Sequence, residues 1–135
     1  MSLIEAVMID DFDRRTKEVN KQLLAGADVN QIEEDDLTPL NVAVLFDYKE
    51  TVIMLLENKA DPNQYNKKEL YPIKIAAVSK NFSMVRLLLR HGANPFPALL
   101  YAAKNGDIDL IKNLVLVCGI SVSLLMTTDI QSGRA

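Results

Sequence analysis

The sequence repeats with a period of 33 residues, and this period limits the fold more strongly than any other feature. Residues 38–44 read Thr-Pro-Leu-Asn-Val-Ala-Val and residues 71–77 read Tyr-Pro-Ile-Lys-Ile-Ala-Ala, at an offset of 71 − 38 = 33. The same offset relates apolar residues further along both units: Val52 to Val85, Leu55 to Leu88 and Leu56 to Leu89. A fixed period of this length is typical of stacked copies of one small unit, each burying its apolar faces on its neighbours. We therefore expect a solenoid.

Two weaker copies flank this pair. Residues 98–115 repeat both halves of the unit, but their start near Pro97 lies only 97 − 71 = 26 residues after the previous start. Seven residues (33 − 26) are therefore missing from the connection after Pro95. On the other side, residues 3–7 are suited to an opening helix, and residues 10–16 are interpreted as an inserted connection.

The residues at the ends of each unit are typical of helix boundaries. Thr38 is suited to cap a helix with its hydroxyl, and Pro39 fits the first helical position, where no N–H bond is lost. Gly26 and Gly92 stand where a helix end needs a left-handed residue, and Lys59 at the same position would cost about 1 kcal/mol if it adopts a positive φ. We expect helix pairs at about 3–24, 38–58, 71–91 and 97–117, with projecting loops at 30–37 and 63–70.

These motifs resemble the ankyrin repeat family, whose unit opens with Thr-Pro-Leu-His and ends with Gly-Ala-Asp-Val-Asn, the sequence of residues 26–30. The resemblance extends from about residue 3 to residue 123, although Asn41, Lys74 and Leu100 replace the family's histidine. It implies an all-α solenoid of helix-turn-helix pairs joined by hairpin-like loops. The implied arrangement is one domain over 1–126, with repeats at about 1–30, 31–63, 64–96 and 97–123, and a flexible tail at 127–135.

Charge and composition exclude several classes of protein. The 15 basic and 18 acidic residues give a net charge of −3, which argues against a nucleic-acid partner because such proteins need a basic face. No apolar run approaches the ~20 residues of a membrane span, and no signal peptide is expected at the N-terminus. The single cysteine, Cys118, cannot form an internal disulfide and favours a reducing, cytoplasmic location.

No residue group in the sequence predicts catalysis. The single histidine, His91, has no second histidine or cysteine cluster with which to bind a metal. The acidic run at 33–36 lacks the alternating ligands and the glycine of a calcium loop, and Cys118 has no surrounding reactive-thiol motif. We therefore expect a protein that is not an enzyme and needs neither cofactor nor metal.

The resemblance implies a protein partner that binds the loop tips and the exposed side of the first helices. Carried over position by position, it selects residues of two loops: Glu34, Asp35 and Leu37, then Lys67, Lys68 and Leu70. On and after the first helices it selects Leu45, Phe46 and the nearby Tyr48, then Val78 and Ser79, then Lys104 and Asn105. Phe46 is either an exposed interface anchor or a residue that packs against an adjacent loop. The two loops differ in sign, which predicts a partner of complementary alternating charge.

Other interpretations stay open at this level. The chain is alternatively the targeting part of a larger enzyme, or of a bacterial or viral effector delivered into host cells. Self-association through the C-terminal end is a further alternative, because residues 124–126 read Leu-Leu-Met where a terminal unit needs a polar outer face. Asn30 and Asn63 match a loop asparagine that is hydroxylated in some members of the family. The partner itself is not identified by the sequence.

Overall fold

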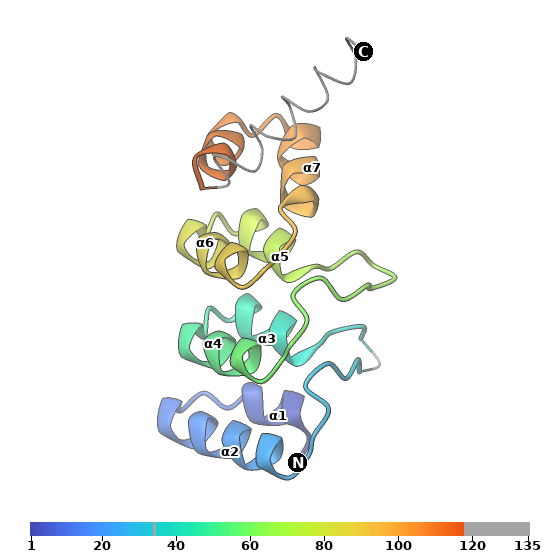
Figure 1. Ribbon diagram of the computed structural model, residues 1–135, viewed down its shortest axis with the longest axis vertical. Helices are drawn as coiled ribbons and strands as arrows, with labels where there is room; N and C mark the ends of the chain where they lie inside the picture. Colours follow the sequence, from blue (N-terminus) through green and yellow to red (C-terminus); the bar gives the residue numbers. More distant parts are fainter. Residues whose placement is uncertain (34, 118–135) are drawn as a thin grey trace.

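The computed structural model describes residues 1–33 and 35–117, which form a column of stacked helix pairs (Figure 1). Three pairs are α1 (Leu3–Val7) with α2 (Phe12–Leu24), α3 (Pro39–Leu45) with α4 (Lys49–Glu57), and α5 (Pro72–Val78) with α6 (Phe82–Arg90). The fourth is α7 (Phe96–Asn105) with a helix that begins at residue 108 and reaches residue 117. The described residues contain no strand, so the predicted all-α solenoid is confirmed.

The first helices of the pairs, α1, α3, α5 and α7, pack against one another in that order, and the core is made by them together with the second helices. Ala43, Ala76 and Ala102 occupy the same position in α3, α5 and α7 and are at most 1% exposed. Because a methyl group takes so little space, neighbouring helices approach closely at these points. The larger Leu40 and Ile73, each 1% exposed, fill the space beside them. The alternation of small and large side chains therefore sets the spacing of the stack.

The starts of the helices follow the predicted chemistry at Thr38 and depart from it at Tyr71. The Thr38 hydroxyl accepts a hydrogen bond from the backbone N–H of Asn41 at 3.1 Å, and Pro39 occupies the first turn. At the equivalent position of the next repeat Tyr71 makes no side-chain cap, although Pro72 again begins the helix. The proline and the burial of the helix therefore suffice to start α5 without a capping hydroxyl.

The prediction of an inserted connection at 10–16 is wrong from residue 12 onward. The first helices α1 and α3 are offset by 40 − 3 = 37 residues, whereas Gly26 and Lys59 after the second helices are offset by 59 − 26 = 33. The four additional residues form an extra N-terminal turn of α2, which has 13 residues against 9 in α4. Asp11 stabilises this turn, because its carboxylate accepts the N–H of Asp13 at 2.9 Å. The insertion is therefore real, but it is helical.

Left-handed residues recur at three positions of the repeat. After the second helices, Gly26, Lys59 and Gly92 have φ of 88°, 72° and 90°, so Lys59 does adopt the positive φ of the equivalent glycines. Between the two helices of a pair the left-handed residues are Asp47, Lys80 and Gly106, and in the projecting loops they are Asp36 and Glu69. At each of these positions the left-handed conformation is therefore kept even where a residue other than glycine is present.

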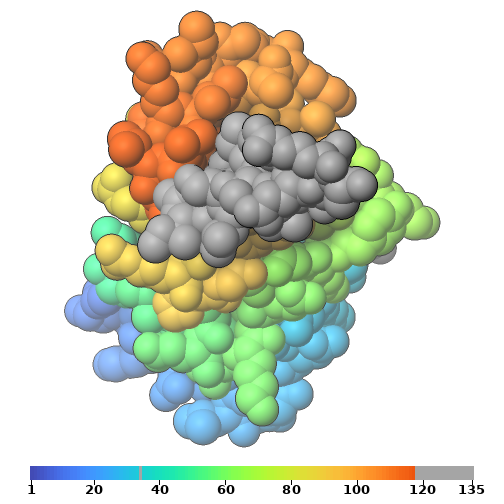
Figure 2. Space-filling view, turned by 45° about the horizontal axis from the view of Figure 1, so that its top comes forward, coloured from blue at the N-terminus to red at the C-terminus, as the bar shows by residue number. Residues whose placement is uncertain are grey.

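The connections between pairs differ in length as the sequence predicts. Residues 58–71 join α4 to α5 and residues 25–38 join α2 to α3, and their loops project from the same side of the column (Figure 1). Only residues 91–95 join α6 to α7, so the shortened connection is confirmed. Figure 2 shows the loop of residues 63–70, in light green, standing out from the body of the molecule. Other predictions fall outside the described residues: those on Glu34, Cys118, the repeat end at 118–123, the segment 124–126 and the tail at 127–135.

Candidate protein-binding surface

The connections between repeats are tied together by asparagine side chains. Asn30 accepts the backbone N–H of Asp61 at 2.7 Å and donates to the carbonyl of Lys59 at 3.3 Å. Asn63 repeats this arrangement with the N–H of Asn94 at 2.7 Å and the carbonyl of Gly92 at 2.9 Å. Both asparagines thus hold one repeat to the next, a structural role that the sequence did not predict.

The two projecting loops are joined by further contacts. Asn66 donates to the carbonyl of Asp36, and Asn41, which replaces the family's histidine, donates to the carbonyl of Leu70 at 2.9 Å. Lys68 lies 3.8 Å from Asp36 in an ion pair that stays open to solvent. The opposite charges of the loops therefore partly face one another. Because the pair is exposed, it adds little to stability.

A row of exposed apolar side chains crosses the ends of the first helices. Met8, Leu45 and Val78 are 51%, 57% and 50% exposed. They are equivalent residues, because 45 − 8 = 37 and 78 − 45 = 33 are the offsets of α1 to α3 and of α3 to α5. We call these three residues the first-helix row. Leu45 and Val78 were predicted, whereas Met8 was missed because the 37-residue offset was not recognised.

Phe46 and Tyr48 differ in role although both lie between α3 and α4. The Tyr48 ring covers the guanidinium of Arg15, whose Cζ is 3.5 Å from the ring centroid and whose side chain is 4% exposed. Arg15 also donates to the Thr51 hydroxyl at 3.1 Å and to the carbonyl of Ile9 at 2.7 Å. Phe46 stacks on Tyr48 at 5.5 Å between centroids and stays 47% exposed. Tyr48 is therefore part of the packing, and Phe46 extends the surface beside the first-helix row.

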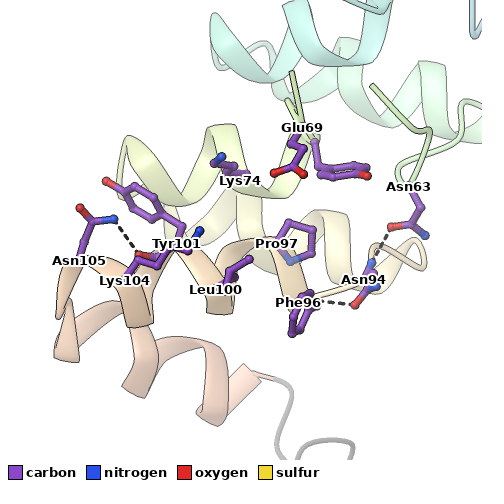
Figure 3. A pocket seen from close by; sticks show the side chains of 11 residues that line it. Asn63, Glu69, Lys74, Asn94, Phe96, Pro97, Leu100, Tyr101, Lys104 and Asn105 are labelled. Carbon is purple, nitrogen blue, oxygen red and sulfur yellow. Dashed lines mark hydrogen bonds between the residues drawn. The ribbon is translucent and has the colours of Figure 1, made fainter. Parts of the chain in front are cut away.

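A pocket of about 330 Å³ opens between the second projecting loop and α7 (Figure 3). One wall comes from the loop and α5: Asn63, Glu69, Tyr71 and Lys74. The other comes from the shortened connection and α7: Asn94, Phe96, Pro97, Leu100, Tyr101, Lys104 and Asn105. Lys104 and Asn105 were predicted as partner-binding residues and the others were not. The seven-residue deletion in the sequence could have indicated the other lining residues, because it removes the loop that would otherwise fill the pocket.

The remaining predicted residues lie in the loops and at a helix end. Asp35 and Lys67 are exposed, whereas Leu37 and Leu70 are half-buried beneath the loops. Asp35 accepts the N–H of Leu37 at 3.2 Å, and Ser79 at the end of α5 donates to the carbonyl of Ile75 at 3.1 Å. The structure thus divides the predicted set into a loop group, a group beside the first-helix row and a group in the pocket.

The described residues offer few groups for chemistry. His91 is the exposed residue that ends α6, and residues 1–33 and 35–117 hold no cluster of three or more His, Cys, Asp or Glu able to bind a metal ion. Over the same part of the chain, no helix combines the length and the apolar character that crossing a membrane requires.

Comparison with known proteins identifies one similarity. A family model described as ankyrin repeats (3 copies) matches residues 3–97. The matched range covers α1 to α6 and ends where the shortened connection meets α7. A search of curated proteins gives no match.

Proposed function

The chain belongs to the ankyrin repeat family, whose repeats are generally protein–protein interaction modules, and we propose that it is a scaffold or adaptor that binds one protein partner. The partner covers the concave face at the first-helix row, together with Phe46 and the loop tips. Ankyrin repeat domains are typically non-catalytic, and the proposal includes no catalysis, nucleic acid or membrane. The proposed location is the cytoplasm, in keeping with the single cysteine.

The observation that carries this proposal is the repetition of exposed apolar side chains at one position of three successive repeats. A single exposed leucine is ordinary on a protein surface, but Met8, Leu45 and Val78 lie side by side because the helices that carry them pack together. Adjacent first helices lie about 8–10 Å apart, so the row spans a length suited to one partner helix or strand. Covering each side chain would contribute about 1 kcal/mol to binding.

The loop tips supply polar contacts at the edge of this surface. Lys67 and Asp35 are exposed, and Lys68 forms an ion pair with Asp36. Charged groups at such an edge act mainly on the association rate and on the choice of partner. The proposed loop contribution is therefore to specificity.

Affinity capture with the full chain tests the proposal. The double variant Leu45→Ser, Val78→Ser removes two apolar side chains of the row, and Phe46→Ala truncates the ring beside it without touching the Tyr48–Arg15 contact. The matched control is Leu24→Ser, Ile108→Ser, since these side chains are 81% and 63% exposed away from the row. We expect a partner that the wild type and the control retain and that the row variants lose, with circular dichroism unchanged. Equal capture by the row variants and the wild type would contradict the proposal.

A further inference from the structure

The hydrogen bonds between repeats stop abruptly at the shortened connection. The contact of Asn30 with residues 59–61 is repeated by Asn63 with residues 92–94. Besides the bonds of the Asn30 side chain, residues 30–41 and the second loop share three bonds: Gln64 to the Asn30 carbonyl at 2.9 Å, Asn66 to the Asp36 carbonyl, and Asn41 of α3 to the Leu70 carbonyl at 2.9 Å. Among the described residues, none of these three has a counterpart between the second loop and residues 91–95.

The groups that would receive the missing bonds belong to residues that line the pocket. Asn63 and Glu69 are the equivalents of Asn30 and Asp36 at the 33-residue offset, and both line the pocket. Their carbonyl oxygens accept no hydrogen bond from any described residue. Glu69 has φ of 55° where Asp36 has 63°, so both residues are left-handed at the same position of the loop. The pocket is therefore the place of an absent third loop.

The deletion before α7 removes the counterpart of residues 63–69. In the third repeat residues 63–69 separate Pro62 from Leu70, whereas in the fourth Pro95 is followed directly by Phe96. The seven absent residues would have run beside the loop of residues 63–70, in which residues 64–66 form no turn and residues 66–69 close a turn through the Glu69 N–H and the Asn66 carbonyl at 2.8 Å. A short extended peptide, like residues 64–66 of the neighbouring loop, suits this space, because its backbone N–H groups can reach carbonyls along such an edge.

Side chains around the pocket specify the charge of that peptide. Lys74 occupies the position of Asn41, and Lys104 lies on α7, so two lysines line the pocket against the single carboxylate of Glu69 (Figure 3). Neither lysine forms an ion pair within 4 Å with a described residue. Phe96 and Leu100 add apolar surface that is 61% and 39% exposed. A carboxylate next to an apolar side chain complements this combination.

We propose that the pocket binds an extended peptide segment of a partner protein, with an acidic residue held by Lys74 and Lys104 and an apolar side chain on Phe96 and Leu100. The segment takes the place of the absent loop and donates its backbone N–H groups to Asn63 and Glu69. This inference rests on the proposed function, because it adds a second contact of the same protein partner at a site separate from the first-helix row.

Synthetic peptide libraries test the proposal with the full chain. One library of about eight residues, a length that spans the loop edge, fixes Phe and a nearby Asp, and the matched library carries Lys in place of Asp. Binding is followed by NMR at the backbone amides of Glu69, Leu100 and Lys104. We expect the acidic library to bind about tenfold more tightly than the basic one and to shift these amides. The variant Lys74→Gln, Lys104→Gln should remove that preference.

A grafted variant provides the decisive control. Inserting a second copy of residues 63–69 between Pro95 and Phe96 restores the absent loop, which should occupy the pocket and abolish peptide binding while the helical circular dichroism is kept. Equal binding of the two libraries, or undiminished binding by the folded graft, would overturn the proposal. If the lysine variant does not fold, the graft alone decides. Capture of a partner through the first-helix row is measured separately, so a failed pocket and a failed function give different results.

Discussion

Individual residues in this chain hold backbone conformations that a glycine would adopt more easily. Lys59 has φ of 72° at the position where Gly26 and Gly92 end the preceding and following second helices. The left-handed conformation brings the Cβ atom close to the carbonyl oxygen, at a cost of about 1–2 kcal/mol. The surrounding repeat nevertheless fixes the conformation, since Asn30 binds the Lys59 carbonyl and Ala60 donates to the Leu55 carbonyl at 2.9 Å.

Replacing this lysine should therefore stabilise the protein. We expect Lys59→Gly to raise the free energy of unfolding by about 1 kcal/mol, because the Cβ strain is removed and both backbone bonds stay. Urea denaturation measures the change. The matched control is Gly92→Ala, where an added Cβ meets no atom within 4 Å, so its effect isolates the backbone strain and should be a loss of similar size. A neutral or destabilising Lys59→Gly would show that the repeat tolerates the conformation without strain.

At the scale of the element, the extra turn of α2 joins the first repeat to the second. Arg15 in this turn is buried without a carboxylate partner in the described residues, and the Ile9 and Asp10 carbonyls, the Thr51 hydroxyl and the Tyr48 ring satisfy its guanidinium. Desolvating a cation against a ring strengthens their attraction. The insertion therefore adds a contact that a shorter α2 could not make, since a nine-residue helix like α4 would lack this turn.

The contribution of this contact follows from removing the charge while keeping the length of the side chain. We expect Arg15→Met to lower the free energy of unfolding by about 2 kcal/mol, because three carbonyl or hydroxyl acceptors and the ring lose their donor. The exposed neighbour Arg14 supplies the control, and Arg14→Met should change stability by less than about 0.5 kcal/mol. Denaturant titration of both variants gives the comparison. Similar losses in the two variants would mean that the extra turn contributes only helix length.

At the scale of the whole molecule, the stack is a chain of nearest-neighbour interfaces, so its stability varies along its length. Residues 30–41 and residues 59–70 share six contacts beyond helix packing: two through the Asn30 side chain and one each through Gln64, Asn66, Asn41 and Lys68. Between the third repeat and the fourth, the described residues show the two bonds of the Asn63 side chain and an exposed ion pair of Lys80 with Asp107 at 3.9 Å. The interface before α7 is therefore the more weakly held of the two.

Hydrogen exchange measures this difference directly. Backbone amides in α7 should exchange at least about tenfold faster than those in α5, because α7 opens without breaking the loop contacts that hold α5. The graft that restores residues 63–69 after Pro95 is the control, and it should slow the exchange of α7 towards that of α5. Equal protection of α5 and α7 in the unmodified chain would contradict the weaker interface.

The repeat units and helix boundaries could be predicted from the sequence because they depend on local chemistry and on a fixed spacing. Thr38, Pro39 and Gly92 act within a few residues of themselves, and the 33-residue period shows which residues are equivalent. The shortened connection before α7 was also visible, since a deletion changes the period wherever it falls. Leu45 and Val78 could be predicted as partner-binding residues because they are equivalent to positions that bind partners in the family.

Only the tertiary structure decided what the insertion in the first repeat and the deletion before the fourth repeat become in the folded chain. The four-residue insertion could have been a loop or a helical turn, and the burial of Arg15 under Tyr48, a residue of the next repeat, selects the turn. The deletion could have closed the stack tightly, but in the folded chain it leaves a pocket between Glu69 and Lys104. Both outcomes depend on contacts between residues distant in sequence. A local sequence pattern does not specify such contacts, because they form only when distant parts of the chain pack together.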